Sequence, residues 1–482
     1  MYIDSVNLKD VKCFKDIKLE FQTAALTQDR QSNWNVILGD NGDGKTTLLQ
    51  AIAVCLMDAA TAQKLLDPND WVRHDQKTAQ LTAKLIQEKD DKPQPGRPVK
   101  DPKSDYTVQY LIVDANQEIE LEKETLFEVA PPRFFPTATI LEPASDYGHL
   151  FGPDYESVIA DMDFIKRNAL AKRTRSGWHS CGYGAFRRIS GFSTSTAKVD
   201  VQLQKRFLTL FEEGAALYDV ESWLKELDRK AKKSKKGSIT RKSLQDATDL
   251  ICKLLPQVYE IKIQDQVEFM WHGNPTSLNQ LSDGYRSMFA LVIDLLRWLE
   301  LARSDTKIPL NQVKGVVLID EIDAHLHPKW QRQVGFWLTK FFPNIQFIVA
   351  SHSPFVAMAA GEGALTLLQK EGNVVRANQD VPYVRGWAVG QVLTSLFDMI
   401  SLRDPETAKL LEEYEELLLA HRAGKLKPAQ EEELAQLEND LNARMTGSRD
   451  APEQQELEQD LVFFADLLRE KRTMTNAQDP TS

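Results

Sequence analysis

The residues whose types and spacing point most clearly to chemistry form a glycine-rich stretch near the N-terminus. It reads Gly39-Asp40-Asn41-Gly42-Asp43-Gly44-Lys45-Thr46-Thr47 and lies between apolar residues 34–38 and 48–54. A strand, a glycine-rich loop and a helix in this order are the setting of a phosphate-binding loop. Glycines let backbone N–H groups turn toward phosphates, and the helix N-terminus adds positive partial charge. Lys45 would reach the β- and γ-phosphates and Thr46 would ligate Mg2+, so we predict nucleotide binding.

Two apolar runs in the second half end in polar side chains. Residues 316–319 lead to Asp320 and Glu321, and residues 345–350 lead to Ser351-His352-Ser353-Pro354. Buried parallel strands deliver such groups to one sheet edge, where two carboxylates can hold Mg2+ and polarise water. A strand followed by an acidic helix cap is the alternative for the two acids. His352 is predicted to contact a γ-phosphate, although a single histidine after a strand is more often structural.

Two further motifs are less specific. Ser282-Asp283-Gly284 precedes an apolar helix at 288–301, and a helix N-terminus capped by serine suits a γ-phosphate. The same three residues are also an ordinary capping sequence. His325-Leu326-His327 suggests a metal pair, but no third ligand follows in a suitable pattern, so we favour packing and interface roles.

Composition bounds the class of protein. The chain has 482 residues, 42% of them hydrophobic, and a net charge of −11, which argues against a uniformly basic nucleic-acid binder. No apolar run approaches the length of a membrane span and the N-terminus lacks a signal-peptide pattern, so we expect a cytoplasmic protein without membrane contact. The four cysteines follow no disulfide or zinc spacing.

Periodicity predicts the elements around these motifs. Residues 2–22 should form a hairpin whose sheet continues into the strand before the glycine-rich loop, and residues 364–376 a closing hairpin. Residues 203–228 and 243–255 should be amphipathic helices, separated by an exposed basic loop at 229–237 that could contact a polyanion. Helices are also expected at 392–401, 405–422, 428–445 and 452–471. Basic residues between 166 and 188 suit either a solvated face or a nucleic-acid or phosphate site.

Together the stretches GDNGDGKTT, LSDGYRS, VVLIDE, IDAHLHP and ASHSP resemble the ATP-binding-cassette (ABC) ATPase heads of the RecF, SMC and Rad50 type. More narrowly, they resemble AAA-family ATPases of bacterial defence and virulence-associated loci, of the Septu PtuA kind. The resemblance implies an α/β fold: an ABC-ATPase head (mixed sheet with P-loop, flanking helices) with a mixed insertion and a helical C-terminal region. The expected boundaries are 1–60 and 275–385 for the head, 61–274 for the insertion, 386–472 for the helical region and 473–482 for a disordered tail.

The resemblance also implies roles for the motif residues. Gly39 to Thr46 become the Walker A loop, and Asp320 supports Mg2+ together with Thr46. Glu321 becomes the base or water-orienting residue, assisted in catalysis by His352 and Lys45. Residues implied to contact ATP are Gly39, Asp40, Asn41, Gly42, Asp43, Gly44, Lys45, Thr46, Thr47, Ser282, Asp283, Gly284 and Asp323. Of these, Ser282 and Gly284 would touch the ATP of a second subunit, and Asp323 would lie in the loop joining the two sites.

The implied activity is ATP hydrolysis by a homodimer or higher homo-oligomer. In the signature motif around Ser282, many ABC ATPases have Gly and Gln at the positions of Asp283 and Tyr285, and Asp283 brings a negative charge that could slow turnover. A second departure is that no Q-loop glutamine is evident. The leading hypothesis is a sensor or regulator of a separate, HNH-type nuclease in antiphage defence. A RecF-like repair ATPase that binds DNA directly is the alternative, and a transporter subunit fits the long insertion less well. A fused Toprim nuclease is not indicated, because Glu371-Gly372 is better interpreted as a hairpin turn.

Overall fold

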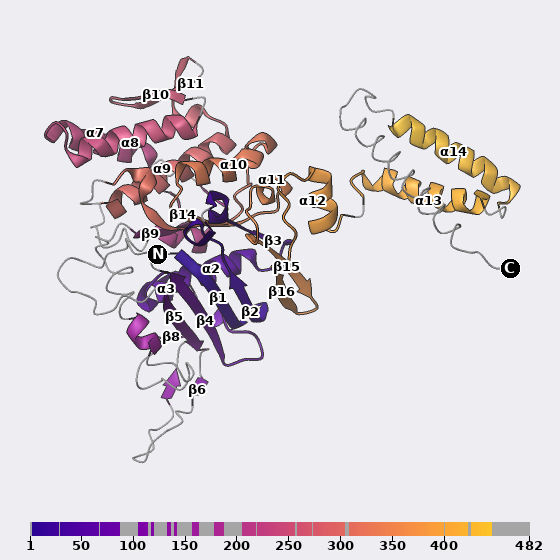
Figure 1. Ribbon diagram of the computed structural model, residues 1–482, viewed down its shortest axis with the longest axis horizontal. Helices are drawn as coiled ribbons and strands as arrows, with labels where there is room; N and C mark the ends of the chain where they lie inside the picture. Colours follow the sequence, from indigo (N-terminus) through magenta and orange to yellow (C-terminus); the bar gives the residue numbers. More distant parts are fainter. Residues whose placement is uncertain are drawn as a thin grey trace, which may run out of the picture. The chain divides into compact units, whose positions relative to one another are not determined.

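Two sheets form the core of Met1–Val392, the first of two units in the computed structural model; the second unit is Leu393–Ser482 (Figure 1). The structure describes residues 2–445, apart from 87–104, 114–116, 120–132, 136–138, 142–156, 163–177, 188–204, 304–307 and 423–425, and apart from 28, 67, 218, 256–257, 272 and 400.

The first sheet has six strands and positions the predicted motifs. Its order is β16 (Val374–Asn378), β15 (Leu365–Glu371), β3 (Trp34–Leu38), β14 (Ile345–Ala350), β13 (Lys314–Ile319) and β9 (Trp178–Tyr183). The strands from β15 to β9 run parallel, whereas β16 pairs antiparallel with β15, as predicted for the closing hairpin. Every residue of β3 and β14 is buried, which is typical of parallel strands covered on both faces. The segments that follow β3, β14, β13 and β9 therefore meet at one edge.

The second sheet has five strands that pair antiparallel. Its order is β2 (Phe14–Glu20), β1 (Tyr2–Val11), β4 (Thr78–Ile86), β5 (Asp105–Val113) and β8 (Thr139–Leu141). The N-terminal hairpin is confirmed, but its predicted continuation into β3 is wrong. Both edges of β1 are already occupied, because Val6 faces Leu19 of β2 and Ala83 of β4.

Helix α2 (Lys45–Cys55) lies between the two sheets and packs against strands of both. Its buried apolar residues join one hydrophobic cluster with residues of β1, β4, β5, β13 and β14. The segment 61–274 contributes to both sheets, since β4, β5 and β8 belong to the antiparallel sheet and β9 to the other. The helix that begins at the glycine-rich loop is thus held by the whole core of this unit.

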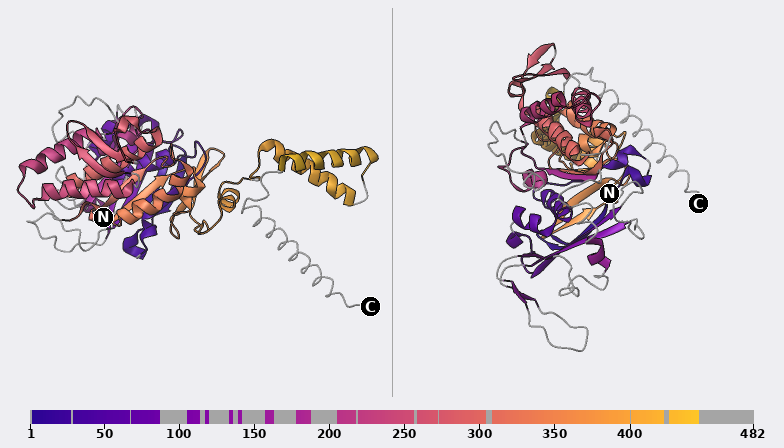
Figure 2. Two further views of the ribbon diagram at one scale, coloured as in Figure 1. Left: turned by 90° about the horizontal axis from the view of Figure 1, so that it is seen from above. Right: turned by 90° about the vertical axis from the view of Figure 1, so that its left-hand side faces the viewer.

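Four longer helices accompany the six-stranded sheet (Figure 1). They are α7 (Val220–Lys233), α8 (Ile239–Leu254), α9 (Asp283–Arg303) and α10 (Pro328–Phe341). Helices α7 and α8 lie side by side (Figure 2), followed by a small sheet of β10 (Val258–Ile263), β11 (Val267–Trp271) and β12 (Asn274–Thr276). The predicted loop at 229–237 is wrong in its first half, because α7 continues to Lys233. Ala231 is still buried, and the Lys230–Glu226 and Lys232–Asp228 ion pairs, at 2.8 and 2.6 Å, support the last turns.

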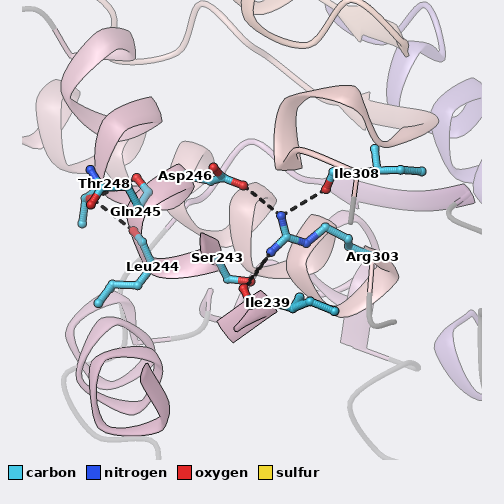
Figure 3. A network of polar contacts seen from close by, with 8 residues as sticks. All are labelled: Ile239, Ser243, Leu244, Gln245, Asp246, Thr248, Arg303 and Ile308. Carbon is cyan, nitrogen blue, oxygen red and sulfur yellow. Dashed lines mark hydrogen bonds and ion pairs between the residues drawn. The ribbon is translucent and has the colours of Figure 1, made fainter. Parts of the chain in front are cut away.

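A buried arginine ties α9 to α8 (Figure 3). Arg303, at the end of α9, is 2% exposed and donates to Asp246 Oδ2 at 2.9 Å and to the Ile308 carbonyl at 3.1 Å. It also donates to Ser243 Oγ and the Ile239 carbonyl, both of α8. The far end of α9 is therefore fixed to α8.

The remaining elements are short or belong to the second unit. The short ones are α1 (Ala24–Thr27), α3 (Ala59–Leu65), α6 (Leu208–Phe211), α11 (Pro354–Ala357), α12 (Val389–Leu396), β6 (Gln117–Ile119) and β7 (Arg133–Phe135). Helices α13 (Pro405–Arg422) and α14 (Pro428–Met445) have the predicted bounds and pack against each other, whereas the helix predicted at 452–471 lies outside the described residues.

All four cysteines are free. Within the described part of the chain, every helix is too short or too polar to span a bilayer.

Candidate nucleotide-binding site

The glycine-rich loop joins β3 to α2 in a backbone conformation that requires glycine. Gly42 and Gly44 have φ values of 89° and 81°, in the left-handed region. A Cβ atom on Gly44 would lie 2.6 Å from Cys13 Sγ and 2.8 Å from Phe14 Cζ, so the loop also packs too closely for a larger residue there. Asp43 closes the loop, since its Oδ2 accepts a hydrogen bond from the Asp40 N–H at 2.7 Å.

Lys45 curls back over this loop. Its Nζ donates to the carbonyls of Gly39 at 2.9 Å and Asp40 at 2.8 Å. Burial lowers the Lys45 pKa, while nearby acids, Asp43 first among them, oppose that shift. An ammonium group has three donors, so the two bonds fix its position and leave one donor for an anion.

Thr46 and Asp320 meet between the loop and the end of β13. The Thr46 hydroxyl donates to Asp320 Oδ2 at 2.6 Å, and burial raises the pKa of Asp320. Asp320 Oδ1 is buried and has no hydrogen-bond partner. A carboxylate oxygen left unsatisfied beside a hydroxyl oxygen is a donor set that suits Mg2+, so the residues fit the predicted metal.

Glu321 follows with an unusual backbone, at φ 44°. Its carbonyl and that of Asp320 both accept from Nη2 of Arg187, at 2.6 and 2.7 Å. Arg187 comes from the segment after β9, which pairs in parallel with β13 through residues as far as Tyr183 and Ile319. The predicted carboxylates therefore sit on a turn that a distant arginine holds.

Asp323 and the segment around His352 are linked by polar contacts. The Ser351 hydroxyl donates to Asp323 Oδ1. Gln331 Nε2 donates to the Asp323 carbonyl at 3.3 Å, and Gln331 Oε1 accepts from Ser353 Oγ at 2.8 Å. His352 lies half-buried between the two serines, directly after β14 and at the same sheet edge as the glycine-rich loop.

Ser282 lies at the molecular surface, immediately before α9. Both Ser282 and Asp283 are exposed, and Arg286 forms an ion pair with the Asp283 carboxylate, which partly offsets its charge. A Cβ atom on Gly284 would lie 2.2 Å from the His325 carbonyl oxygen, so this turn fits tightly against the helix start. A hollow of about 600 Å³ opens here, lined by Ser282, Gly284, Tyr285, His325, Leu326, His327, Lys329 and Trp330.

The two histidines of this turn have local structural contacts. His327 is the N-cap of α10, and its Nδ1 accepts from the Lys329 N–H at 3.2 Å. His325 has φ 65° and presents its carbonyl to Gly284. Among the described residues no set of three His, Cys, Asp or Glu side chains has metal-site geometry.

Two family models that describe AAA domains match this chain, and several curated proteins are similar to it in sequence. A family model described as "AAA domain, putative AbiEii toxin, Type IV TA system" matches residues 151–359, and one described as "AAA domain" matches residues 5–131. The chain is 37% identical to "Retron Ec83 probable ATPase" of Escherichia coli over 190 residues, 38% of this chain and 34% of that protein. It is 24% identical to "Septu protein PtuA" of Bacillus mycoides (strain KBAB4) over 455 residues, 92% of this chain and 50% of that protein.

Among solved structures, the "SmcHead bound to the C-winged helix domain of ScpA" aligns with 78% of this chain and 97% of its own, at a TM-score of 0.42 and 14% identity. The chain spans half or less of the length of the two curated relatives. Both matching family models describe AAA domains, and the glycine-rich loop with Thr46 and Asp320 has the arrangement of a phosphate-binding loop. The chain is similar to the retron ATPase and to the Septu protein named above.

Three contributors to the site are absent from the sequence-based prediction. In the sequence Arg187 is part of a basic stretch only, and Ser351 and Gln331 carry no predicted role. Their contacts join segments far apart in the chain, so no local pattern identifies them.

Proposed function

We propose that the chain hydrolyses ATP between two copies of itself and thereby regulates a separate nuclease in antiphage defence. The observation that carries the catalytic part is the Thr46–Asp320 hydrogen bond with Asp320 Oδ1 left unsatisfied, at the N-terminus of α2. A hydroxyl and a carboxylate oxygen beside backbone N–H groups form a site for a metal and a polyphosphate.

The residues of this site have distinct tasks. The backbone of residues 39–46 and the third donor of Lys45 bind the phosphates. Thr46 and Asp320 would hold Mg2+, which when bound would offset the charge of the phosphates. Glu321 accepts a proton from the water that attacks the γ-phosphorus, while the bond from that phosphorus to the β–γ bridging oxygen breaks and ADP and phosphate leave. His352 contacts the γ-phosphate from the end of β14.

Two copies are proposed because Ser282, in the signature motif, is exposed. Ser282 and the N-terminus of the long helix α9 face solvent beside the hollow described above. An exposed helix N-terminus attracts anions, so it suits the γ-phosphate of ATP held by another copy. Asp323, on the turn after Glu321, would then lie at the seam between the two sites.

A separate nuclease partner is proposed from the similarity to the Septu protein, which extends over 92% of this chain. The test is co-expression of the tagged full chain with the product of a neighbouring nuclease gene. We expect the nuclease to copurify and its DNA cleavage to change when ATP is added. The Lys45→Ala chain is the control, since it should not respond to ATP. A nuclease that neither binds nor responds would contradict the regulatory role.

Direct DNA binding is a second candidate, because the turn between α7 and α8 is strongly basic. Residues 229–242 hold eight Lys and Arg and no Asp or Glu, in a chain of net charge −11. Among the described residues, no ion pair involves Lys233, Lys235, Lys236 or Lys242, all of which are exposed.

Replacement of these four lysines by alanine tests the DNA role. If DNA binds here, the slope of log affinity against log salt should become less negative by about 0.9 for each DNA phosphate that the variant no longer neutralises. A matched control replaces four exposed lysines elsewhere on the first unit: Lys9, Lys15, Lys77 and Lys370. Equal slopes for the two variants would remove the α7–α8 turn from DNA binding.

A further inference from the structure

Arg187 is a buried cation whose identified hydrogen bonds go to backbone atoms. It is 6% exposed, and its Nη2 donates to the carbonyls of Asp320 at 2.7 Å and Glu321 at 2.6 Å. Guanidinium groups beside carboxylates usually bind them through two parallel hydrogen bonds. Here the carbonyls take the hydrogen bonds, and Asp320 Oδ1 stays without a hydrogen-bond partner.

The turn that Arg187 holds is in an unfavourable conformation. Glu321 has φ 44°, which residues other than glycine rarely adopt and which persists only where surrounding structure enforces it. The Asp320 N–H donates to the Tyr183 carbonyl at 2.8 Å, and the Ala324 N–H to the Glu321 carbonyl at 2.9 Å. Arg187 adds the contact that joins two successive carbonyls of this turn to one donor.

The charge of Arg187 also suits this place. Burial lowers its pKa to about 10, against the opposing effect of Asp320, Asp323 and Glu321, so the group stays protonated near neutral pH. The positive charge of Arg187 therefore lies near three carboxylates, those of Asp320, Glu321 and Asp323. It stabilises them together without occupying the oxygen atoms that chemistry would need.

We infer that Arg187 is a positioning residue for the proposed ATP hydrolysis: it fixes the backbone of the Asp320–Glu321 turn and so aims the Glu321 carboxylate. This inference rests on the proposed function. Through Arg187, the segment that follows β9 contacts directly the turn that carries Glu321, the proposed base.

The test compares Arg187→Gln in the full chain with Arg206→Gln. Arg206 is a matched control, because it is buried, donates to the Leu56 carbonyl at 2.9 Å and likewise has a pKa lowered to about 10. Fluorescent ATP binding, melting temperature and steady-state kcat are measured. We expect Arg187→Gln to lower kcat by about 10- to 100-fold with a Kd for ATP within about threefold of wild type, and Arg206→Gln to lower only the melting temperature.

A double variant shows whether Arg187 acts through Glu321. In a Glu321→Gln background, Arg187→Gln should lower kcat by less than about twofold further, because the group that it positions is already gone. Full additivity of the two effects would overturn the inference. So would a raised Kd for ATP at unchanged kcat, or an equal loss of kcat in Arg206→Gln.

Arg187→Lys carries the test if Arg187→Gln does not fold. Lysine keeps the charge, but its side chain is shorter, so we do not expect its ammonium group to reach the carbonyls of both Asp320 and Glu321. The kcat should therefore still fall at least about threefold at an unchanged Kd for ATP. A wild-type kcat in this variant would overturn the inference about Arg187 and leave the proposed function standing. A wild-type chain that binds ATP and never hydrolyses it would overturn the proposed function itself.

Discussion

A methyl group added at Gly44 should destabilise the first unit more than one added at Gly42, and the difference follows from the structure. Both glycines have positive φ, at 81° and 89°, so alanine at either position costs about 1–2 kcal/mol of backbone strain. The reduced flexibility of the unfolded chain is the same for both substitutions and cancels.

Only Gly44 has neighbours in the way. Its Cβ would meet Cys13 Sγ at 2.6 Å and Phe14 Cζ at 2.8 Å, whereas a Cβ on Gly42 meets nothing within 4 Å. Overpacking of this kind costs about 1–3 kcal/mol. We therefore expect Gly44→Ala to lower the free energy of unfolding by about 1–3 kcal/mol more than Gly42→Ala does.

Urea unfolding followed by tryptophan fluorescence measures this difference. All nine tryptophans lie before residue 393, so the signal reports on the first unit alone. The two variants should show similar m-values and separate midpoints. Equal midpoints, or a Gly44→Ala chain that is the more stable of the two, would refute the packing argument.

Three further predictions concern catalysis, the pH dependence of stability and the buried arginine at the end of α9. Glu321→Gln should keep ATP binding and lower phosphate release by about 10²- to 10⁴-fold, and unchanged release would remove Glu321 from its role. Burial lowers the pKa of His179 to about 3, next to Trp298. The folded-state pKa lies below the unfolded value, so stability is complete above about pH 6.5 and falls toward pH 3 by about 1.4 kcal/mol per unit. His179→Phe should remove that slope in urea titrations at several pH values, and an unchanged slope would place the titrating group elsewhere. Arg303→Met should cost about 3 kcal/mol of stability because it removes the guanidinium bonds to Asp246 and to the Ile308 carbonyl, and a melting temperature equal to wild type would contradict the network in Figure 3.

The parts of the site that follow one another in the chain were predictable. Residues 34–54 carry strand, loop and helix signals within one stretch, and Asp320 and His352 each follow a buried β-branched strand. Because these strands run parallel, their ends meet at one edge, and the pattern alone brings the motifs together.

The parts that depend on strand pairing were not predictable. Arg187 reaches the turn at Glu321 only because β9 pairs with β13, and nothing in the sequence near residue 178 indicates that pairing. The N-terminal hairpin joined a separate sheet because β4 occupies the second edge of β1, a long-range choice that periodicity does not encode. Periodicity also misplaced the end of α7, since its lysine-rich last turns show few apolar positions and are held by ion pairs along the helix.

The proposal that ATP is enclosed between two copies is tested most directly by mixing two inactive variants. Lys45→Ala removes the phosphate contact of a copy's own loop, and Ser282→Arg blocks the surface that would meet the other copy's ATP. Neither variant should hydrolyse ATP alone. A mixed pair contains one intact site, so an equal mixture should recover about a quarter of wild-type turnover if the copies pair at random. A mixture that stays inactive, or a Ser282→Arg chain that hydrolyses ATP normally by itself, would contradict the two-copy site.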